Sequence, residues 1–167
     1  MLQAIERANS VLLEIKLIPL SRGLVTFIDE WNYEKLSRFK WSALSTGYAV
    51  RMEKGGAMIL MHRVITDAKT GHHVDHINGN KADNRECNLR LCSPSENLSN
   101  IAKHKDNRSG FKGVYWVKRR GRFAARIMKN YKPWHLGYFD DAIEAAIAYD
   151  SKCRELHGEF ARTNFPK

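Results

Sequence analysis

The sequence predicts an α+β protein built from three small modules. Residues 1–60 mix strand-like apolar runs with one short helix, and residues 61–102 are rich in Asn, His and Asp. Residues 113–167 contain three strand-like runs followed by one helix, which predicts a three-stranded antiparallel sheet packed on that helix. Residues 103–112 are polar and basic, as is typical of a linker.

The N-terminal segment is predicted to be a small β-rich module. Strand-like runs cover residues 11–17, 24–28, 48–52 and 57–61. A short helix is expected from Asp29 to about Phe39, with Asp29 capping its first turn. Large aromatic side chains are expected in the core, because so small a module needs them to bury enough apolar area. These residues are Trp31, Tyr33, Phe39 and Trp41.

The C-terminal segment has the most regular pattern. Strands are predicted at residues 113–119, 122–129 and 134–139, with turns at 120–121 and 130–133. The helix is expected to start at Asp140 or Asp141 and to end at Gly158. One helical face collects Ala142, Ala145, Ala146, Tyr149, Cys153 and Leu156. Small alanines on that face would let the helix lie close to the sheet, while the other sheet face presents arginines.

The net charge of +10 predicts a polyanionic partner. Residues 101–135 hold eleven Lys or Arg and a single acid, Asp106, so this segment accounts for the whole excess. Aromatic residues are interleaved with these charges, which favours nucleic acid binding over a merely solvated basic surface. They are Tyr115, Trp116, Tyr131 and Trp134.

Cysteine and apolar content predict an intracellular, reduced and soluble protein. The three cysteines make no even disulfide framework, and the chain has no secretory signal and no apolar run near 18 residues. We therefore expect a cytoplasmic, nucleoid-associated protein of the host cell with no membrane partner.

Residues 74–80 (VDHINGN) bring together an acid, an imidazole and amides. His76 is a candidate to accept a proton from water, because an unperturbed imidazole has a pKa of about 6.5. Asp75 offers the hard oxygen ligand that Mg²⁺ prefers. Neighbouring strand residues point to opposite sides, so the turn at residues 78–80 is expected to let both face one phosphodiester.

Residues 93–97 (SPSEN) predict the start of a helix. Ser93 would be the N-cap, Pro94 the first helical residue, and Glu96 would close a capping box. Asn97 would lie in the first turns, where its amide oxygen could reach the same metal. The predicted arrangement is strand, turn, strand, helix.

Each of these residues also has a plainer interpretation. The asparagines at 78, 80, 84 and 88 could be turn residues only, and a zinc site could form from Cys87, Cys92, His72 and His73. The zinc alternative is weak, because two thiols separated by four residues lack a convincing second ligand pair. His62 could be a site residue, although a core histidine at a strand start is favoured.

Four separated elements resemble the HNH motif of phage and intron-encoded homing endonucleases: His62-Arg63, VDHINGN, DNRECNLR and SPSENLSN. The resemblance implies a ββα-metal nuclease module in which Asp75 and Asn97 bind metal. It implies that His76 is the general base and that Asn88 braces the motif and orients the histidine. Asn97 replaces the final His of the motif, as in nicking members, which favours one Mg²⁺ or Mn²⁺.

Residues 110–166 resemble the plant ethylene-response-factor (AP-two type) DNA-binding domain through FKGVYW, FAARI, HLGYFD and the stretch ending in NFP. The resemblance implies a sheet that lies in the major groove. The implied DNA face contains Lys112, Tyr115, Arg119 or Arg120, Arg122 and Arg126, and the linker residues Lys103, Lys105 and Arg108 are expected to follow phosphates. Tyr115, Val117, Arg126 and His135 depart from the plant pattern, so its base preference cannot be carried over.

Together these features predict a site-preferring, metal-dependent DNA endonuclease, most simply a nicking homing enzyme. It would act as a monomer on double-stranded DNA and leave 5′-phosphate and 3′-hydroxyl ends. The alternative is a non-catalytic, sequence-specific DNA-binding regulator that keeps a relic HNH fold.

Overall fold

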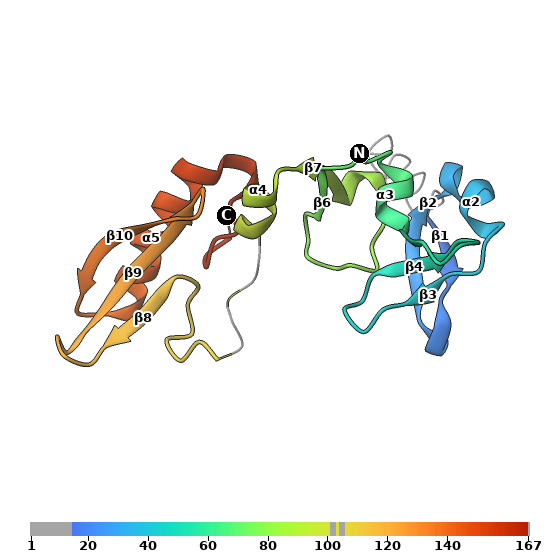
Figure 1. Ribbon diagram of the computed structural model, residues 1–167. Helices are drawn as coiled ribbons and strands as arrows, with labels where there is room; N and C mark the ends of the chain where they lie inside the picture. The colour runs from blue at the N-terminus through green and yellow to red at the C-terminus, as the bar shows by residue number, and fades with distance from the viewer. Residues whose placement is uncertain (1–14, 101–102, 104–105, 167) are drawn as a thin grey trace, which may run out of the picture. The chain divides into compact units, whose positions relative to one another are not determined.

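The computed structural model of the protein describes residues 15–100, 103 and 106–166 (Figure 1). The chain divides into two compact units, one up to Leu91 and one from Cys92 onward. Both combine short antiparallel sheets with few helices, so the predicted mixed α and β architecture is confirmed.

Residues 15–65 of the first unit form two small antiparallel sheets and two short α-helices. The first sheet pairs β1 (Ile15–Pro19) with β2 (Val25–Asp29), which leads into α2 (Glu30–Ser37). The second sheet has the order β3 (Ser42–Ala43), β4 (Ala49–Met52) and β5 (Met58–Leu60), and is followed by α3 (Met61–Ile65). Aliphatic residues from both sheets and both helices share one core around Ile28, Leu36 and Met61.

A further strand pair follows, formed by β6 (His73–His76) and β7 (Leu89–Cys92). The loop between these strands carries a short 3-10 helix, Glu86–Asn88. This loop hydrogen-bonds to β2, since the Phe27 amide donates to Ala82 O and the Asn84 amide donates to Phe27 O, both at 2.8 Å. The N-terminal sheet therefore supports the loop that carries the Asn-rich motif.

Several predictions for the first unit are wrong in detail. Trp41 is buried, but Trp31, Tyr33 and Phe39 are 59%, 40% and 45% exposed, because aliphatic side chains fill the core in their place. Asp29 precedes α2 as expected, yet its carboxylate accepts from the Glu86 amide at 2.7 Å and does not cap the helix. Part of the strand predicted at residues 11–17 lies outside the described residues.

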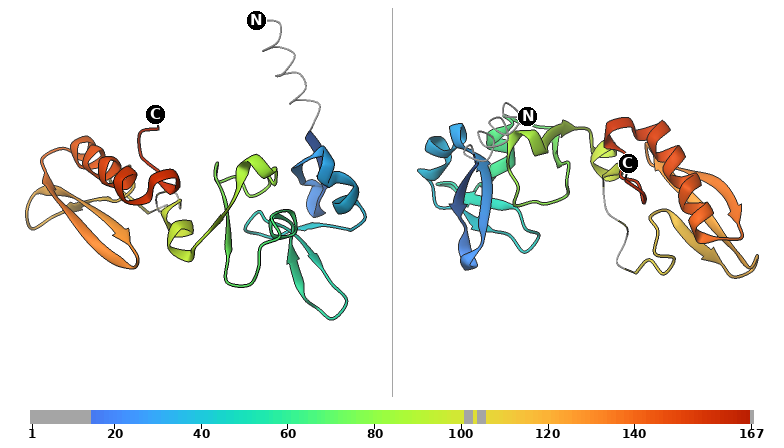
Figure 2. Two further views of the ribbon diagram at one scale, coloured as in Figure 1. Left: turned by 90° about the horizontal axis from the view of Figure 1, so that it is seen from above. Right: turned by 180° about the vertical axis from the view of Figure 1, so that it is seen from behind.

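The second unit begins with α4 (Pro94–Ser99) and continues with β8 (Val114–Val117), β9 (Arg122–Lys129), β10 (Lys132–Phe139) and α5 (Ala142–His157). The sheet order is β10-β9-β8, and α5 lies along one face of it (Figure 2). Asp141 caps α5 by accepting from the amides of Ile143 and Glu144, and the helix ends at Gly158, as predicted.

Two features let α5 lie close to the sheet. The first is the alanine pair Ala145 and Ala146, which is fully buried. The second is Gly113, with φ of +77°, where an added Cβ would meet the Tyr149 ring at 2.1 Å. The predicted turn at 130–133 is shorter than expected: Asn130 and Tyr131 have positive φ, and Pro133 lies within the edge strand β10, where proline is tolerated.

Candidate functional site

His76 ends β6 and is held by a buried polar chain within the first unit. Its Nε2 lies 3.3 Å from Asn84 Oδ1, and Asn84 Nδ2 donates to Thr26 Oγ1 at 2.7 Å. Thr26 in turn donates its hydroxyl proton to Ala82 O at 2.7 Å. All three side chains are at least 95% buried, with exposed fractions of 4%, 0% and 0%.

This chain fixes the tautomer of the imidazole. The Thr26 hydroxyl uses its proton on Ala82, so it accepts from the Asn84 amide nitrogen and leaves Asn84 Oδ1 facing His76. An amide oxygen only accepts, so Nε2 of neutral His76 carries the proton and Nδ1 is its basic nitrogen. Burial lowers the pKa of His76, against the opposing effect of the Asn84 hydrogen bond. The imidazole is therefore neutral and able to take up a proton at neutral pH.

Asp75, on the same strand, is paired with an arginine from β7. Its Oδ2 accepts from Arg90 Nε at 2.9 Å and from Arg90 Nη2 at 2.7 Å. The side chains of Asp75 and Arg90 are only 7% and 13% exposed. The two-point contact fixes the orientation of the carboxylate group. The sequence alone predicts no role for Arg90. Its position on β7, the strand paired with β6, is the feature that could have indicated a contact with Asp75.

Asn88 braces the turn that follows His76. Its Oδ1 accepts from the Asn78 amide at 2.9 Å, and its Nδ2 donates to Asp83 O at 2.8 Å. Asp83 is held by Arg85 at 2.7 Å and accepts from Asn78 Nδ2 at 2.9 Å. The imidazole itself is contacted by Asn84, which sequence reasoning treated only as a possible turn residue.

Two further aromatic groups contact His76. His62 lies on α3, not at a strand start, and its ring centroid is 5.2 Å from that of His76 with the planes at 88°. Tyr48 lies 5.1 Å from His62 and 5.8 Å from His76, ring to ring. Burial, with the neighbouring His76 and Arg63, lowers the pKa of His62 to about 3. Burial and then the Asp75 charge raise the pKa of Tyr48.

The loop after the site is clamped to the N-terminal residues. Glu86 Oε1 accepts from Trp31 Nε1 at 3.0 Å and from Asn32 Nδ2 at 2.8 Å, and the Glu86 amide donates to Asp29. The exposure of Trp31 and the missing cap on α2 thus have the same cause. The Trp31 indole and the Asp29 carboxylate both hydrogen-bond to Glu86, so Trp31 is not in the core and Asp29 does not cap the helix.

Asn97 lies on α4, which belongs to the second unit. The predicted capping box is present: the Ser93 side chain accepts from the Glu96 amide at 3.2 Å, and Glu96 Oε2 accepts from the Ser93 amide at 2.8 Å. The end of α4 is held inside its own unit, since Ser99 Oγ lies 2.9 Å from His157 Nδ1. The role of Asn97 as a metal ligand stays a prediction.

Asp75 supplies a buried, oriented carboxylate in the first unit, and a carboxylate oxygen is a ligand that Mg²⁺ accepts. Binding of a metal at this carboxylate stays a prediction. The zinc alternative is not supported. Within residues 15–100, 103 and 106–166, no group of three or more His, Cys, Asp or Glu is arranged to hold a metal. Cys87 is exposed and Cys92 is buried.

The sheet face opposite α5 combines aromatic and cationic groups. Tyr115 and Tyr138 flank Ala124 in register, and Ala124 is fully buried between its neighbours. The Arg126 guanidinium lies 5.8 Å from the Tyr115 ring, and the Arg120 guanidinium lies 4.3 Å from the Tyr138 ring. Both guanidinium groups are therefore held against tyrosine rings by cation–π attraction.

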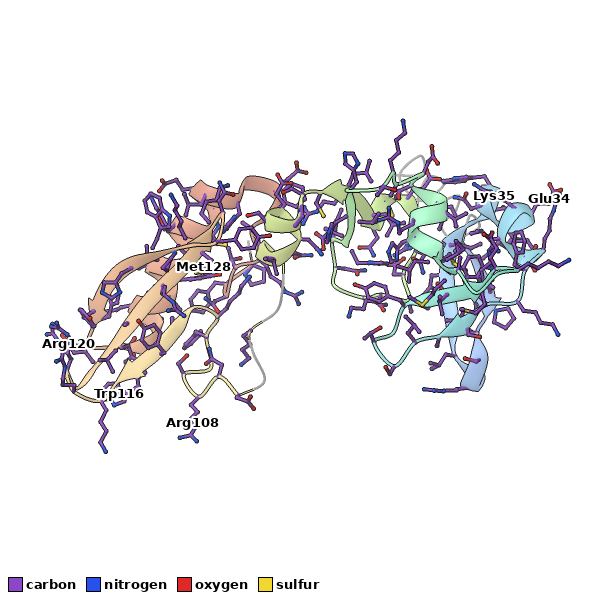
Figure 3. The ribbon with its side chains drawn as sticks, in the orientation of Figure 1. Glu34, Lys35, Arg108, Trp116, Arg120 and Met128 are labelled. Carbon is purple, nitrogen blue, oxygen red and sulfur yellow. The ribbon has the colours of Figure 1, made fainter. Side chains whose placement is uncertain are left out.

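The other predicted DNA-contacting residues are spread around this sheet. Arg119 lies in the exposed β8–β9 turn. Arg120 lies in the same turn, and Arg108 lies in the loop before β8 (Figure 3). Arg122 is half-exposed and pairs with Asp140 at 2.7 Å. Lys103 donates to Gly110 O at 2.8 Å, and Lys105 lies outside the described residues.

Lys112 has a different setting from the exposed arginines. Its ammonium donates to Ser99 O at 2.6 Å and to Arg162 O at 3.3 Å, and burial lowers its pKa to about 8. It thus joins α4 to the C-terminal residues of the same unit. Its part in DNA binding stays a prediction.

Two comparisons with known proteins relate this chain to HNH endonucleases. A family model for HNH endonucleases matches residues 60–99. A protein named as an HNH endonuclease from Acanthamoeba polyphaga mimivirus is 31% identical over 153 residues, which span 87% of this chain and 78% of that protein. Protein 3.8 of Escherichia phage T7 is 38% identical over 92 residues, which span 55% of this chain and 75% of the phage protein.

A third relative matches only a part of the chain. Ethylene-responsive transcription factor 3 of Nicotiana tabacum is 53% identical over 49 residues, which are 28% of this chain and 21% of the plant protein.

Among the described residues, no helix has the length and apolar character needed to cross a membrane.

Proposed function

Because this chain belongs to the HNH endonuclease family and is a DNA endonuclease, we propose that it is a metal-dependent enzyme that nicks double-stranded DNA at preferred sites, as homing endonucleases do. The observation that carries this proposal is the fixed tautomer of His76 beside the Asp75–Arg90 pair. A buried imidazole with a defined basic nitrogen next to an oriented carboxylate is suited to activating water at a phosphodiester.

His76 would act as the general base. With the Nε2 proton held by Asn84, Nδ1 would accept a proton from the attacking water. The water oxygen would form the new bond to phosphorus as the bond to the 3′ oxygen breaks, which leaves a 5′-phosphate and a 3′-hydroxyl end. The imidazolium that forms would be stabilised by the Asp75 and Asp83 charges, both of which raise the pKa of His76.

Asp75 and Asn97 would hold one Mg²⁺ or Mn²⁺. When bound, the metal supplies charge stabilisation at the phosphoryl and leaving oxygens. Arg90 would keep the Asp75 carboxylate oriented, and Asn88 would keep the turn after His76 closed. A single site of this kind cuts one strand in one binding event, so a monomer is expected to nick.

The C-terminal sheet would read the DNA. Its similarity to the plant transcription factor and the tyrosine-stacked arginines on its outer face support an ethylene-response-factor-like domain that enters the major groove. The basic linker before it would follow the phosphate backbone.

The ends of the product test the proposed chemistry. Nicked plasmid from a reaction of the full chain with Mg²⁺ should be resealed directly by a DNA ligase, since that reaction requires a 5′-phosphate and a 3′-hydroxyl. Nicks that reseal only after treatment with phosphatase and kinase would contradict the proposed bond cleavage.

A further inference from the structure

Lys81 lies on the loop after β6 and is partly buried beside the nuclease site. The Lys81 side chain passes close to Gly47, where an added Cβ would lie 3.7 Å from the Lys81 Cβ. The Lys81 ammonium lies 4.5 Å from the centre of the Tyr48 ring. Among the residues that the structure describes, none forms an ion pair or a hydrogen bond with this ammonium. Lys81 is therefore an oriented cation whose three donors have no protein acceptor in the described parts of the chain.

Tyr48 connects this cation to the catalytic histidine. The same ring that lies under the Lys81 ammonium is 5.8 Å from the His76 ring. Lys81 also lines a surface hollow of about 370 Å³ together with Gly47, Gly79 and Asn80. Lys81 thus lies against the ring that contacts His76 and also borders an open hollow on the surface.

We infer that Lys81 binds a non-bridging oxygen of the DNA phosphate that is cleaved at His76. Three donors on a held ammonium match a phosphate oxygen, and a ring face beneath the cation leaves its N–H bonds free to point outward. Gly47 and Gly79, which line the hollow with Lys81, place no side chain in the way of an approaching sugar-phosphate backbone. Lys81 would hold the phosphate for attack and neutralise the charge that grows on its oxygens.

Two other roles for Lys81 are possible on physical grounds, and each predicts a different result. Its only role could be to pack on Tyr48, in which case removing the charge would leave DNA binding unchanged. It could instead act through the field it exerts on His76, since its charge lowers the pKa of that residue. In that case the pH profile of cleavage would move while the salt dependence of DNA binding would not.

The test compares the full chain with K81M, K81R and the control K54M, which removes the same charge from the exposed turn after β4. Single-turnover nicking of supercoiled plasmid with Mg²⁺ is expected to slow by about 100-fold in K81M. K81R should stay within about tenfold of the wild type, because an arginine also binds phosphate oxygens. K54M should nick like the wild type.

The second readout is binding of duplex DNA in EDTA at increasing salt, followed by fluorescence anisotropy. Loss of one phosphate contact should reduce the slope of log affinity against log salt by about one in K81M, and K81R should restore it. Equal behaviour of K81M and K54M, or a shifted pH profile with an unchanged slope, would overturn the inference. Should K81M melt earlier than the wild type, K81Q takes its place in both measurements.

The inference rests on the proposed metal-dependent cleavage, and the two can fail separately. A wild-type chain that binds DNA but does not nick it with Mg²⁺ contradicts the proposed function, while the salt slope still tests the phosphate contact. A wild type that nicks with Mg²⁺, combined with a K81M variant of unchanged slope, contradicts only the role of Lys81.

Discussion

The ring of His62 meets the ring of His76 edge to face, with centroids 5.2 Å apart and planes at 88°. His62 is 95% buried, with an exposed fraction of 5%, and its Nδ1 has no hydrogen-bond partner among the described residues. Burial lowers its pKa to about 3, so the imidazole of His62 is neutral at neutral pH. We therefore expect His62 to hold His76 by its shape and not by its charge.

Substitution of His62 separates these two roles. H62A should lower the free energy of unfolding by about 2 kcal/mol and slow nicking by about tenfold, because the cavity lets His76 move. H62F keeps a ring and removes an unpaired buried nitrogen, so its stability in denaturant titration should equal or exceed that of the wild type. A rate for H62F as low as that of H76A would contradict this prediction, since it would require a nitrogen of His62 in the reaction.

The Asp75–Arg90 pair should be costly to break. R90L removes the cation that is paired with a buried carboxylate, which typically lowers the free energy of unfolding by about 3 to 5 kcal/mol. The matched control is R38L, which breaks the exposed pair with Glu34 and should change stability by less than about 1 kcal/mol. Urea titrations of both variants check the difference, and equal losses would contradict a buried, orienting role for Arg90.

Thr26 should act on catalysis without touching the substrate. T26V conserves shape but removes the acceptor for Asn84 Nδ2, so the amide can turn and the His76 tautomer is no longer fixed. We expect kcat to fall by about tenfold with little change in KM, because only the activation of water is affected. A T26V variant with raised KM and unchanged kcat would argue against the hydrogen-bond chain.

DNA recognition should be separable from cleavage. R126A removes a guanidinium that stacks on Tyr115 at the outer sheet face, and should weaken binding of a preferred DNA site by about tenfold. Weak nicking of unrelated DNA should remain. If R126A loses that activity to the same extent as H76A, the division of roles between the sheet and the motif is wrong.

Lys112 should make the stability of the second unit depend on pH. Its folded-state pKa of about 8 lies below the usual 10.5, so between these values the unfolded chain binds more protons and stability rises with pH. Burial raises the pKa of Cys153 and of Tyr149, which acts in the opposite direction at the upper end of this range, so the effect of Lys112 is measured as a difference. From pH 7 to 10.5, the free energy of unfolding of the wild type minus that of K112M should rise with pH. If the stability of the two proteins depends on pH in the same way, the lowered pKa of Lys112 does not contribute to it.

Local patterns predicted much of this molecule. The capping box at Ser93, the cap at Asp141 and the helix end at Gly158 each depend on neighbours a few residues apart, and the structure has all three. The support of the site depends on contacts between distant positions. Thr26 and Asn84 are 58 residues apart, and Trp31 and Glu86 are 55 apart. Periodicity and spacing hold no information on such pairs, so Trp31 was expected in the core and Asn84 only in a turn.

Nicking of supercoiled plasmid by the full chain tests the central claim most directly. The wild type should convert plasmid to the open circular form with Mg²⁺ and not with EDTA, and H76A should be slower by at least about 100-fold while binding DNA equally well. DNA binding without metal-dependent nicking, or an H76A variant as active as the wild type, would contradict His76 as the general base of a metal-dependent endonuclease.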